Sequence, residues 1–407
     1  GRAQRRRRYA GALSGRAAPV RASLLDCWRD YRAFKRLPAE PRRIVLFSES
    51  GQDWHHFEPI VAELCGRMGR TICYVSSDPA DRGLHQQSER ILPFCIGDGF
   101  FRILWFQTLD AGVMLTQLLD LGNFDLKRSV HPVHYVYMFH SLISTHMADH
   151  ANSYDHYDTI LCAGPHQARE IRRREELMGL PPKRLVPHGY ARVEQLMRER
   201  RDPPPPHGRD DTHVLLAPSW GPNTILNRFG GELVELLMTA GYRLTLRPHF
   251  QTRWQTPEVI DRIAGRWREH PRFALVEDMA ESDSLFDSHL MITDWSGAGM
   301  DYGLGLEKPV LYFDLPPKSR NDRWQELGIE PFEMRVRDSL GALLKPEQLA
   351  DTPAVIDRLL AEPERFRADM QRLREEWIYN LGGSGRAAAE AVAAIADELD
   401  WPREVPA

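Results

Sequence analysis

The chain has 407 residues, of which 42% are hydrophobic and 27% are charged. This length exceeds the size at which one hydrophobic core usually stops growing, so two domains of roughly 150–200 residues each are expected. No apolar run approaches the roughly 20 residues that span a bilayer, which argues against an integral membrane protein. The five cysteines are scattered and form no CxxC pair, so they argue against a disulfide framework and favour a reducing cytoplasm.

Positive charge is concentrated near the N-terminus. The net charge is −4, yet residues 1–43 carry 13 Lys and Arg against three acidic residues. Residues 1–40 are therefore predicted to form a basic helical arm that contacts an anionic membrane surface, placing a cytoplasmic protein peripherally at the inner face of the cell membrane. The alternative is a helix that packs on the first domain with its arginines solvated. The rest of the chain is acidic and carries no nucleic-acid motif, so nucleic acid is not expected as a partner.

Strand and helix patterns alternate from residue 41 to residue 200, which predicts a parallel sheet covered by helices. The strands are expected at 43–48, 71–76, 133–139 and 159–162, and the helices at 57–67 and 167–178. Four consecutive prolines, Pro203–Pro206, cannot continue a helix or a strand. Residues 201–211 are therefore predicted to be a stiff linker and a domain boundary.

A second alternating series follows over residues 212–362. Strands are expected at 213–217, 243–247, 273–276, 290–293 and 309–313, and helices at 231–239 and 257–267. Residues 363–407 are predicted to be helices that break at residues 382–385. The fold class is thus α/β, with two Rossmann-like domains facing a cleft as in the GT-B class and a basic N-terminal helical arm, although other two-domain α/β enzymes share this architecture.

Residues 290–306 have the pattern of an apolar strand, a polar turn and a glycine-rich helix. Ser296 is a good N-cap, and the free amides of residues 297–299 would present donors and a positive dipole end to phosphate. The same residues can serve capping and packing alone, so both interpretations stay open. Asp294 and Asp301 are given supporting roles, because a carboxylate beside a diphosphate is repelled unless it orients a hydroxyl or caps amides.

Two other predicted strands end in polar residues that would face the cleft. Arg247 could form bidentate bonds with phosphate oxygens, and His249 could donate to a phosphate or move a proton near neutral pH. A surface salt bridge explains Arg247 equally well. Ser219 and Trp220 follow another strand, and Trp220 also suits a core position.

Taken in order, these segments resemble the CDP-glycerol glycerophosphotransferases, which build teichoic acid and related capsule polymers. The matching stretches, spread over roughly residues 130–320, are Ala217-Pro-Ser-Trp220, Arg247-Pro-His249, Thr293-Asp-Trp-Ser296, Met300-Asp-Tyr302, Lys308-Pro-Val310 and Gly189-Tyr-Ala-Arg192-Val-Glu194. The resemblance implies a GT-B fold with an acceptor-side domain at 41–200 and a donor-nucleotide domain at 212–362. It also implies a CDP-activated alditol donor, a lipid-linked glycan or polymer acceptor, and neither metal nor cofactor.

The resemblance further implies roles for single residues. His140 stands where the family has its W-H-G-T histidine, and it is the candidate base that deprotonates an acceptor hydroxyl for attack on the donor's β-phosphorus. His249 is the second predicted catalytic residue, and Arg192 is a candidate contact to the diphosphate or the acceptor. Gly297 replaces a serine of the family pattern, which puts the identity of the donor in question. The predicted donor-binding set is Ser219, Trp220, Arg247, Thr293, Asp294, Ser296, Gly297, Ala298, Gly299 and Asp301.

Three other interpretations compete with this one. A GT-B glycosyltransferase or epimerase using a UDP-sugar would need the same helix start and arginine. The altered histidine motif and the basic arm also suit a non-catalytic nucleotide-binding protein at the membrane. His146 and His150 have i, i+4 spacing that could hold zinc, but no HExxH motif accompanies them, so no metal site is predicted.

Overall fold

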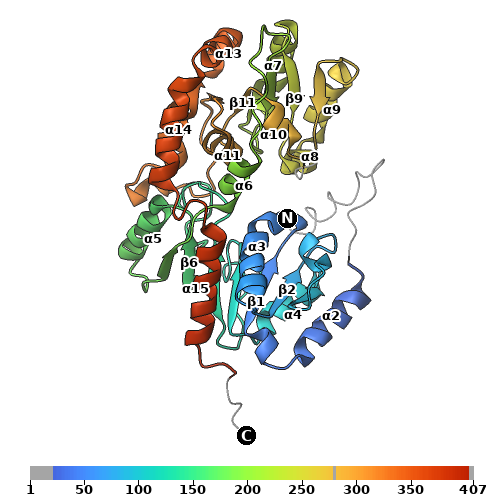
Figure 1. Ribbon diagram of the computed structural model, residues 1–407, viewed down its shortest axis with the longest axis vertical. Helices are drawn as coiled ribbons and strands as arrows, with labels where there is room; N and C mark the ends of the chain where they lie inside the picture. Colours follow the sequence, from blue (N-terminus) through green and yellow to red (C-terminus); the bar gives the residue numbers. More distant parts are fainter. Residues whose placement is uncertain (1–21, 278–280, 403–407) are drawn as a thin grey trace. The chain divides into compact units, whose positions relative to one another are not determined.

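The structure, a computed structural model, describes residues 22–277 and 281–402. The chain divides into two compact units, one holding the residues up to Val136 and those from Val392 onward, the other Tyr137–Ala391 (Figure 1). Two elements span the division, β5 (His134–Met138) and α15 (Ser384–Glu398). The other elements of the first unit are α2 (Leu24–Arg36), β1 (Ile44–Ser48), α3 (Trp54–Val61), β2 (Ile72–Ser76), β3 (Ile91–Cys95), α4 (Phe100–Thr108) and β4 (Val113–Thr116).

The second unit contains the larger number of elements. Its first part holds β6 (Thr159–Cys162), α5 (Pro165–Met178), β7 (Arg184–Pro187) and α6 (Ala191–Glu199). It continues with β8 (His213–Leu216), α7 (Ile225–Thr239), β9 (Arg243–Leu246), α8 (Phe250–Gln255), α9 (Pro257–Trp267), β10 (Phe273–Leu275) and α10 (Asp283–Asp287). The last elements are β11 (Leu290–Thr293), α11 (Gly297–Leu306), β12 (Val310–Phe313), α12 (Phe332–Leu340), β13 (Gly341–Leu344), α13 (Thr352–Ala361) and α14 (Pro363–Trp377).

Within the described residues the strands form two sheets. The seven-stranded sheet has the order β3-β2-β1-β4-β5-β6-β7, and the six-stranded sheet has the order β10-β9-β8-β11-β12-β13. Each pairing in the six-stranded sheet is parallel. Both orders follow the Rossmann pattern, in which the chain reverses direction across the sheet between the first and fourth strands. In the six-stranded sheet this switch point lies between β8 and β11, where ligands of such sheets usually bind.

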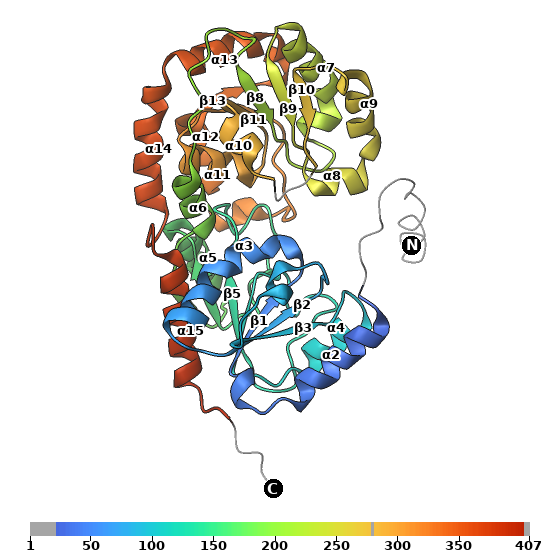
Figure 2. The same cartoon turned by 45° about the vertical axis from the view of Figure 1, so that its right-hand side comes forward.

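Helices cover both faces of the six-stranded sheet. Figure 2 shows α7, α8 and α9 along one side of its strands and α11, α12 and α14 along the other. Because both faces are covered, the central strands β8, β11 and β12 are buried along their whole length. This arrangement confirms the predicted α/β class.

The sequence missed the strands β3, β4, β7 and β13. Three of these, β3, β7 and β13, lie at sheet edges, and each carries a residue that weakens a strand pattern. Pro93 lies within β3, Pro187 ends β7 and Gly341 begins β13. Edge strands tolerate proline because one side of the ladder is unpaired. Residues 201–211 lie between β7 and β8, where the chain passes from one sheet to the other, and we retain them as the proposed domain boundary.

Helix α2 packs on the first unit, as the alternative interpretation of the arm expected. The Phe34 ring makes edge contacts with Phe94 and Trp105, and Lys35 Nζ donates to the Thr108 carbonyl at 2.7 Å. The first turn of the helix leaves Leu24 and Leu25 about three-quarters exposed, at 74% and 78%. The arginine run at residues 5–8 lies outside the described residues.

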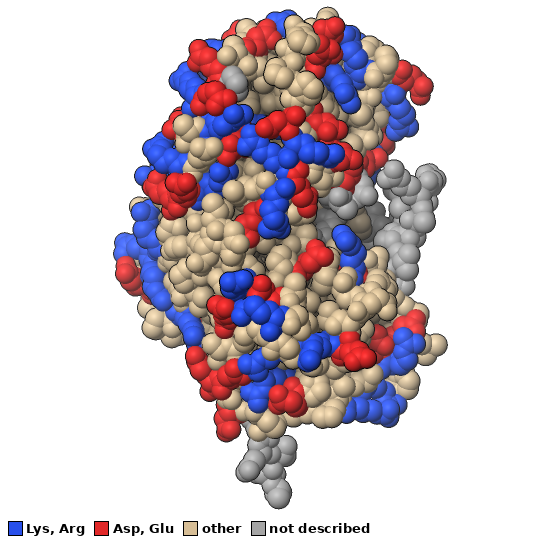
Figure 3. Space-filling model, in the orientation of Figure 1, with Lys and Arg blue, Asp and Glu red and all other residues tan. Residues whose placement is uncertain are grey.

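Basic and acidic side chains are interspersed on the face drawn in Figure 3. Some pair along single helices, such as Arg372 with Asp369 on α14. That face therefore offers no single-sign stripe of the kind that tracks a nucleic-acid backbone. In the part of the chain that the structure describes, no helix combines the length and the apolar character needed to cross a membrane.

Candidate functional site

The candidate site is built at the carboxyl ends of β8 and β11, the switch point of the six-stranded sheet. Asp294, directly after β11, accepts hydrogen bonds from the backbone N–H groups of Ser219 at 2.7 Å and Ile225 at 2.9 Å. Burial raises the pKa of Asp294, and these bonds act against the rise. The carboxylate therefore ties the loop after β8 to the turn after β11.

Helix α11 begins at this turn. Ser296 is its N-cap, and Ser296 Oγ accepts the N–H of Ala298 at 3.3 Å. Gly299 is required for packing, because a Cβ there would lie 2.7 Å from Tyr312 Oη. The cap leaves other amides of the first turn, including that of Gly297, available at the positive end of the helix dipole.

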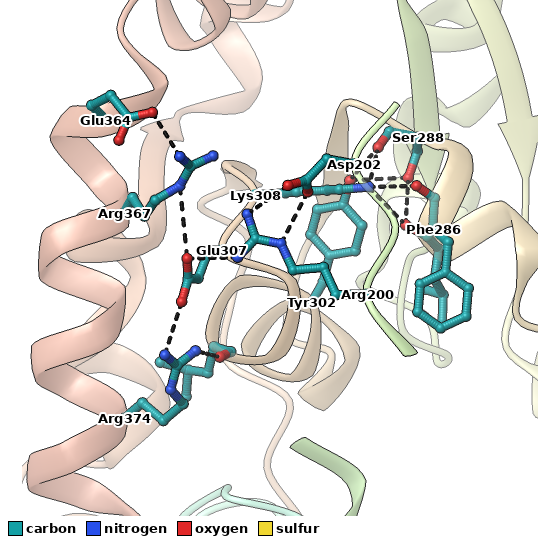
Figure 4. Close-up of polar contacts among 12 residues, drawn as sticks. Arg200, Asp202, Phe286, Ser288, Tyr302, Glu307, Lys308, Glu364, Arg367 and Arg374 are labelled. Carbon is teal, nitrogen blue, oxygen red and sulfur yellow. Dashed lines mark hydrogen bonds and ion pairs between the residues drawn. The ribbon is translucent and has the colours of Figure 1, made fainter. Parts of the chain in front are cut away.

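The opposite end of α11 is fixed by a charged network (Figure 4). Glu307 accepts from Arg200 at 2.6 Å and from Arg374 at 2.8 Å, which joins the helix to α14. The next residue, Lys308, donates to the carbonyls of Phe286 at 2.5 Å and Ser288 at 2.8 Å. Burial lowers the pKa of Lys308 to about 8. The lysine of the family-like K-P-V stretch thus supports the helix.

A cavity of about 130 Å³ opens at the start of α11, entirely within the second unit. Five of the residues predicted from the sequence line it: Ser219, His249, Asp294, Ser296 and Gly297. The cavity is also lined by residues outside the predicted site set: Ile143, Met147, Ala148, Trp295, Met300, Tyr312, Lys318, Glu333 and Arg337. The structure therefore brings four of the ten predicted donor-binding residues together with His249, and adds two cations.

Lys318 and Arg337 give the cavity its positive charge. Lys318 Nζ lies 3.9 Å from the centre of the Trp220 ring, and within the described residues Lys318 forms no ion pair. Burial, followed by repulsion from Arg320, lowers the pKa of Lys318 to about 8. The Arg337 guanidinium stacks 4.0 Å above the Trp295 ring, with Asp314 3.4 Å from its Nη1. Both cations are desolvated and hold donors near the cavity.

Two more polar atoms of residues that line the cavity could each form a further hydrogen bond. Arg337 Nε and Tyr312 Oη are buried and have no hydrogen-bond partner within the part of the chain that the structure describes. A buried donor without a hydrogen-bond partner destabilises the folded protein. A ligand with acceptor oxygens would remove this cost by accepting the hydrogen bond. Glu333, the nearby carboxylate, already accepts from Ser144 N–H and Ser144 Oγ, each at 2.8 Å.

His249 lines the cavity in a defined tautomer. It is the N-cap of α8, and its Nδ1 accepts the N–H of Gln251 at 3.1 Å, so the proton of the neutral ring lies on Nε2. Burial, with a smaller contribution from Lys318, lowers the pKa of His249 to about 3. Without a bound anion, His249 is therefore a neutral donor at physiological pH.

The remaining predicted site residues do not line the cavity. Arg247 donates to the Glu281 carbonyl at 2.6 Å and to Ser284 Oγ at 3.0 Å. Thr293 Oγ1 donates to the Ala217 carbonyl at 2.7 Å, a bond between neighbouring strands. The others that lie outside the lining are Trp220, Ala298, Gly299, Asp301, Arg192 and His140.

The loop that carries His140 nevertheless contacts α11. Ile143 lies 3.8 Å from where a Cβ on Gly297 would be, and the His140 carbonyl accepts from Tyr190 Oη at 3.0 Å. The same Tyr190 Oη lies 3.3 Å from Asp301 Oδ2. His146, farther along the chain, lies with its Nδ1 3.4 Å from Glu170. Within the described residues, no three or more His, Cys, Asp or Glu side chains lie close enough together to hold a metal ion.

Comparison with known proteins identifies the architecture. No protein-family model and no curated protein matches the sequence. Solved structures do match: the wall teichoic acid polymerase TagF has a TM-score of 0.52 and 13% identity over 93% of this chain and 99% of its own. The chain has a GT-B-type fold.

Two further matches support the same assignment. MnaA from S. aureus, solved with UDP, has a TM-score of 0.55 and 14% identity over 89% of this chain and 98% of its own. The UDP-GlcNAc 2-epimerase from Neisseria meningitidis has a TM-score of 0.54 and 12% identity over 87% and 99%. The predicted GT-B class is confirmed, whereas likeness at this identity leaves the reaction to be argued from the site.

Proposed function

We propose that this chain is a transferase whose second unit binds the diphosphate of a nucleotide-activated donor. The observation that carries the proposal is the convergence of the α11 start with Lys318 and Arg337 on one cavity. A helix N-terminus supplies amide donors and a positive dipole end, and the two side chains supply full positive charges. Ser296, His249 and Tyr312 would complete a set of donors for phosphate oxygens.

Electrostatics favours an anionic occupant. Desolvating Lys318 and Arg337 costs free energy that a bound anion would offset through Coulomb attraction in a low dielectric. Two carboxylates, Asp294 and Glu333, also lie at the cavity. They repel a bound anion less than free carboxylates would, because each already accepts hydrogen bonds from backbone or hydroxyl donors. Burial also raises the pKa of both carboxyl groups.

The proposed reaction is transfer of glycerol phosphate, or a similar alditol phosphate, from a CDP-activated donor. An acceptor hydroxyl attacks the β-phosphorus, forming a new O–P bond while the bond to the bridging oxygen breaks and CMP leaves. His140 takes the hydroxyl proton. The motif order of the sequence supports this assignment, as does the fold shared with TagF, one structure of which was soaked with CDPG. The acceptor is a lipid-linked glycan or a polymer of the cell envelope, and we assign no cofactor.

A UDP-sugar donor is the second candidate. Gly297 supports it, because the serine hydroxyl of the glycerophosphotransferase pattern is absent from a residue that lines the cavity. The MnaA structure with UDP and the meningococcal epimerase structure with UDP-GlcNAc show that the same fold accepts uridine nucleotides in those proteins. Under this alternative the same helix start and cations would bind the diphosphate.

A donor panel distinguishes the two. Purified full-length chain would be incubated with CDP-glycerol, CDP-ribitol and UDP-sugars, with nucleotide release followed in the presence of lipid-linked acceptors. Release of CMP from a CDP-alditol alone supports the proposal. Conversion of a UDP-sugar alone assigns the second candidate, and nucleotide binding without turnover of any donor would leave a non-catalytic binding protein.

We also propose that residues 1–43 hold the protein at the anionic inner face of the cell membrane. The exposed side of α2 and the basic composition of these residues support this. Co-sedimentation with vesicles containing anionic lipid should fall roughly tenfold when residues 1–21 are deleted, a change that retains α2 and its buried Phe34. Equal binding of both chains would refute the membrane proposal and leave the donor site unaffected.

A further inference from the structure

Helix α11 contacts the His140 segment at two successive turns. Gly297 at the cavity lies beside Ile143, and Asp301 is four residues farther along, on the same side of the helix. The helix is held against α6 at close range, because a Cβ at Gly305 would lie 2.7 Å from Leu196 Cβ. A residue that bridges Asp301 to the segment therefore joins the proposed phosphate site to the proposed base.

Tyr190 is that bridging residue. It is the N-cap of α6, is 2% exposed, and its Oη is 3.0 Å from the His140 carbonyl and 3.3 Å from Asp301 Oδ2. The Tyr190 hydroxyl has one proton and two possible acceptors, of which the His140 carbonyl is the nearer. An ionised Asp301 accepts from Tyr190 Oη, whereas a protonated Asp301 can donate to it and leave the Tyr190 proton on the His140 carbonyl.

The surroundings of Asp301 favour that arrangement. Burial raises the pKa of Asp301 to about 6, against the opposing effects of the Arg192 charge and of the hydrogen bond from Tyr190. Arg192 also donates to Gln195 Oε1, within α6, at 3.0 Å. The relay from protonated Asp301 through Tyr190 to the His140 backbone therefore forms below about pH 6, and at higher pH Tyr190 bridges the His140 carbonyl and the Asp301 carboxylate.

Other side chains fix the residues that follow His140. Gln167 Nε2 donates to the Ser141 carbonyl at 3.0 Å, and Glu333 accepts from Ser144. The segment after His140 is thus held by α5 and α12. The Tyr190 hydrogen bond instead holds the backbone of His140 itself, the residue whose side chain is proposed to take the proton. A general base must lie within hydrogen-bond reach of its proton, so a small backbone displacement there lowers the rate.

We infer that Tyr190 and Asp301 are positioning residues that hold His140 against the helix whose start binds the donor phosphates. This inference rests on the proposed function, since it assigns the partners of the proposed base. Neither side chain lines the cavity. Loss of the relay should therefore lower kcat and leave donor binding intact.

The test compares two buried tyrosines near the same helix. Tyr190→Phe removes the relay, whereas Tyr302→Phe removes a hydroxyl that bonds Ser288 Oγ at 2.9 Å, away from His140. We expect Tyr190→Phe to lower kcat roughly three- to tenfold with the donor KM within about twofold, and Tyr302→Phe to leave both unchanged. Asp301→Ala should match Tyr190→Phe, and Asp301→Asn, whose amide can donate to Tyr190, should retain kcat.

A second readout needs no turnover. In full-length chain with isotope-labelled histidine, the imidazole resonance of His140, assigned with His140→Gln, should shift in Tyr190→Phe and not in Tyr302→Phe. Identical kcat and identical His140 resonances in the two tyrosine variants overturn the inference. If no donor is turned over, the proposed function has failed and the resonance alone decides: a shift confined to Tyr190→Phe supports the positioning role, and no shift overturns it.

Discussion

The two ends of α11 use charge in different ways. At its C-terminal end, Glu307 is surrounded by Arg200 and Arg374, and Lys308 Nζ is bonded to backbone carbonyls (Figure 4). At its start, Lys318 and Arg337 lie beside a cavity with donor capacity unused. At the C-terminal end, Glu307 and Lys308 bond to charged or carbonyl partners, although Arg374 Nε is buried without a hydrogen-bond partner. At the start, Lys318 forms no ion pair within the described residues, and Arg337 Nε and Tyr312 Oη have no hydrogen-bond partner there. The charged residues at the two ends of α11 can therefore be sorted by whether they bond to one another or line the cavity.

The largest effect on stability is expected at the C-terminal end of α11. Glu307→Ala removes the acceptor of the buried Arg374 and the half-buried Arg200 guanidinium groups and should lower the free energy of unfolding by about 3–5 kcal/mol. Urea unfolding measures the change. Glu364→Ala is the matched control, because its pairing with Arg367 is at the surface, with the Glu364 side chain 75% exposed, and it should cost less than about 1 kcal/mol. Nucleotide affinity of folded Glu307→Ala should stay near wild type; a large loss would remove the distinction between the ends.

At the start of α11 the expected effect is on nucleotide binding instead of stability. Arg337→Ala should weaken binding of a nucleoside diphosphate roughly 10- to 100-fold, because a charge-assisted hydrogen bond contributes about 1.5–3 kcal/mol. Calorimetric titration measures this. Arg335→Ala, an exposed arginine of the same helix, is the control and should bind normally. Equal losses in both variants would show a non-specific charge effect.

Lys318 and Arg337 also show which parts of the candidate site could be predicted from the sequence. The turn at Ser296 was predictable, because a buried strand, an N-cap and glycines follow one another along the chain. Lys318 follows β12, a predicted strand, so the rule that ligands bind at strand ends could have found it. Arg337 lies inside α12 and carries no local signal. Arg247 had the expected type and strand-end position, yet its side chain bonds Glu281 and Ser284, which only tertiary packing decides.

A pH dependence follows from the lowered pKa of Lys318, about 8. The charged form binds phosphate, so affinity should be level below neutrality and fall roughly tenfold between about pH 7 and pH 9 as the ammonium loses its proton. Lys318→Met should bind more weakly at neutral pH and lose this decline. His249, with a pKa of about 3, should contribute no transition in this range. An unchanged decline in Lys318→Met would assign it to another group.

The smallest effect is expected at Gly297. Because Ile143 is 3.8 Å from the position of an added Cβ, Gly297→Ser fits without displacing a neighbour and should change stability by less than about 1 kcal/mol. If the donor is a CDP-alditol, the restored hydroxyl should raise kcat/KM for CDP-glycerol a few-fold relative to UDP-sugars. An increase for UDP-sugars instead would favour the second candidate.

The central claim is that the start of α11 binds a diphosphate, and calorimetric titration of the full-length chain with CDP, UDP, CMP and cytidine tests it most directly. We expect one site at which CDP or UDP binds at least tenfold more tightly than CMP, with cytidine weaker still, and loss of that preference in the Lys318→Ala, Arg337→Ala double variant. Equal affinities for CDP, CMP and cytidine, or unchanged CDP and UDP binding in the double variant, would contradict the account.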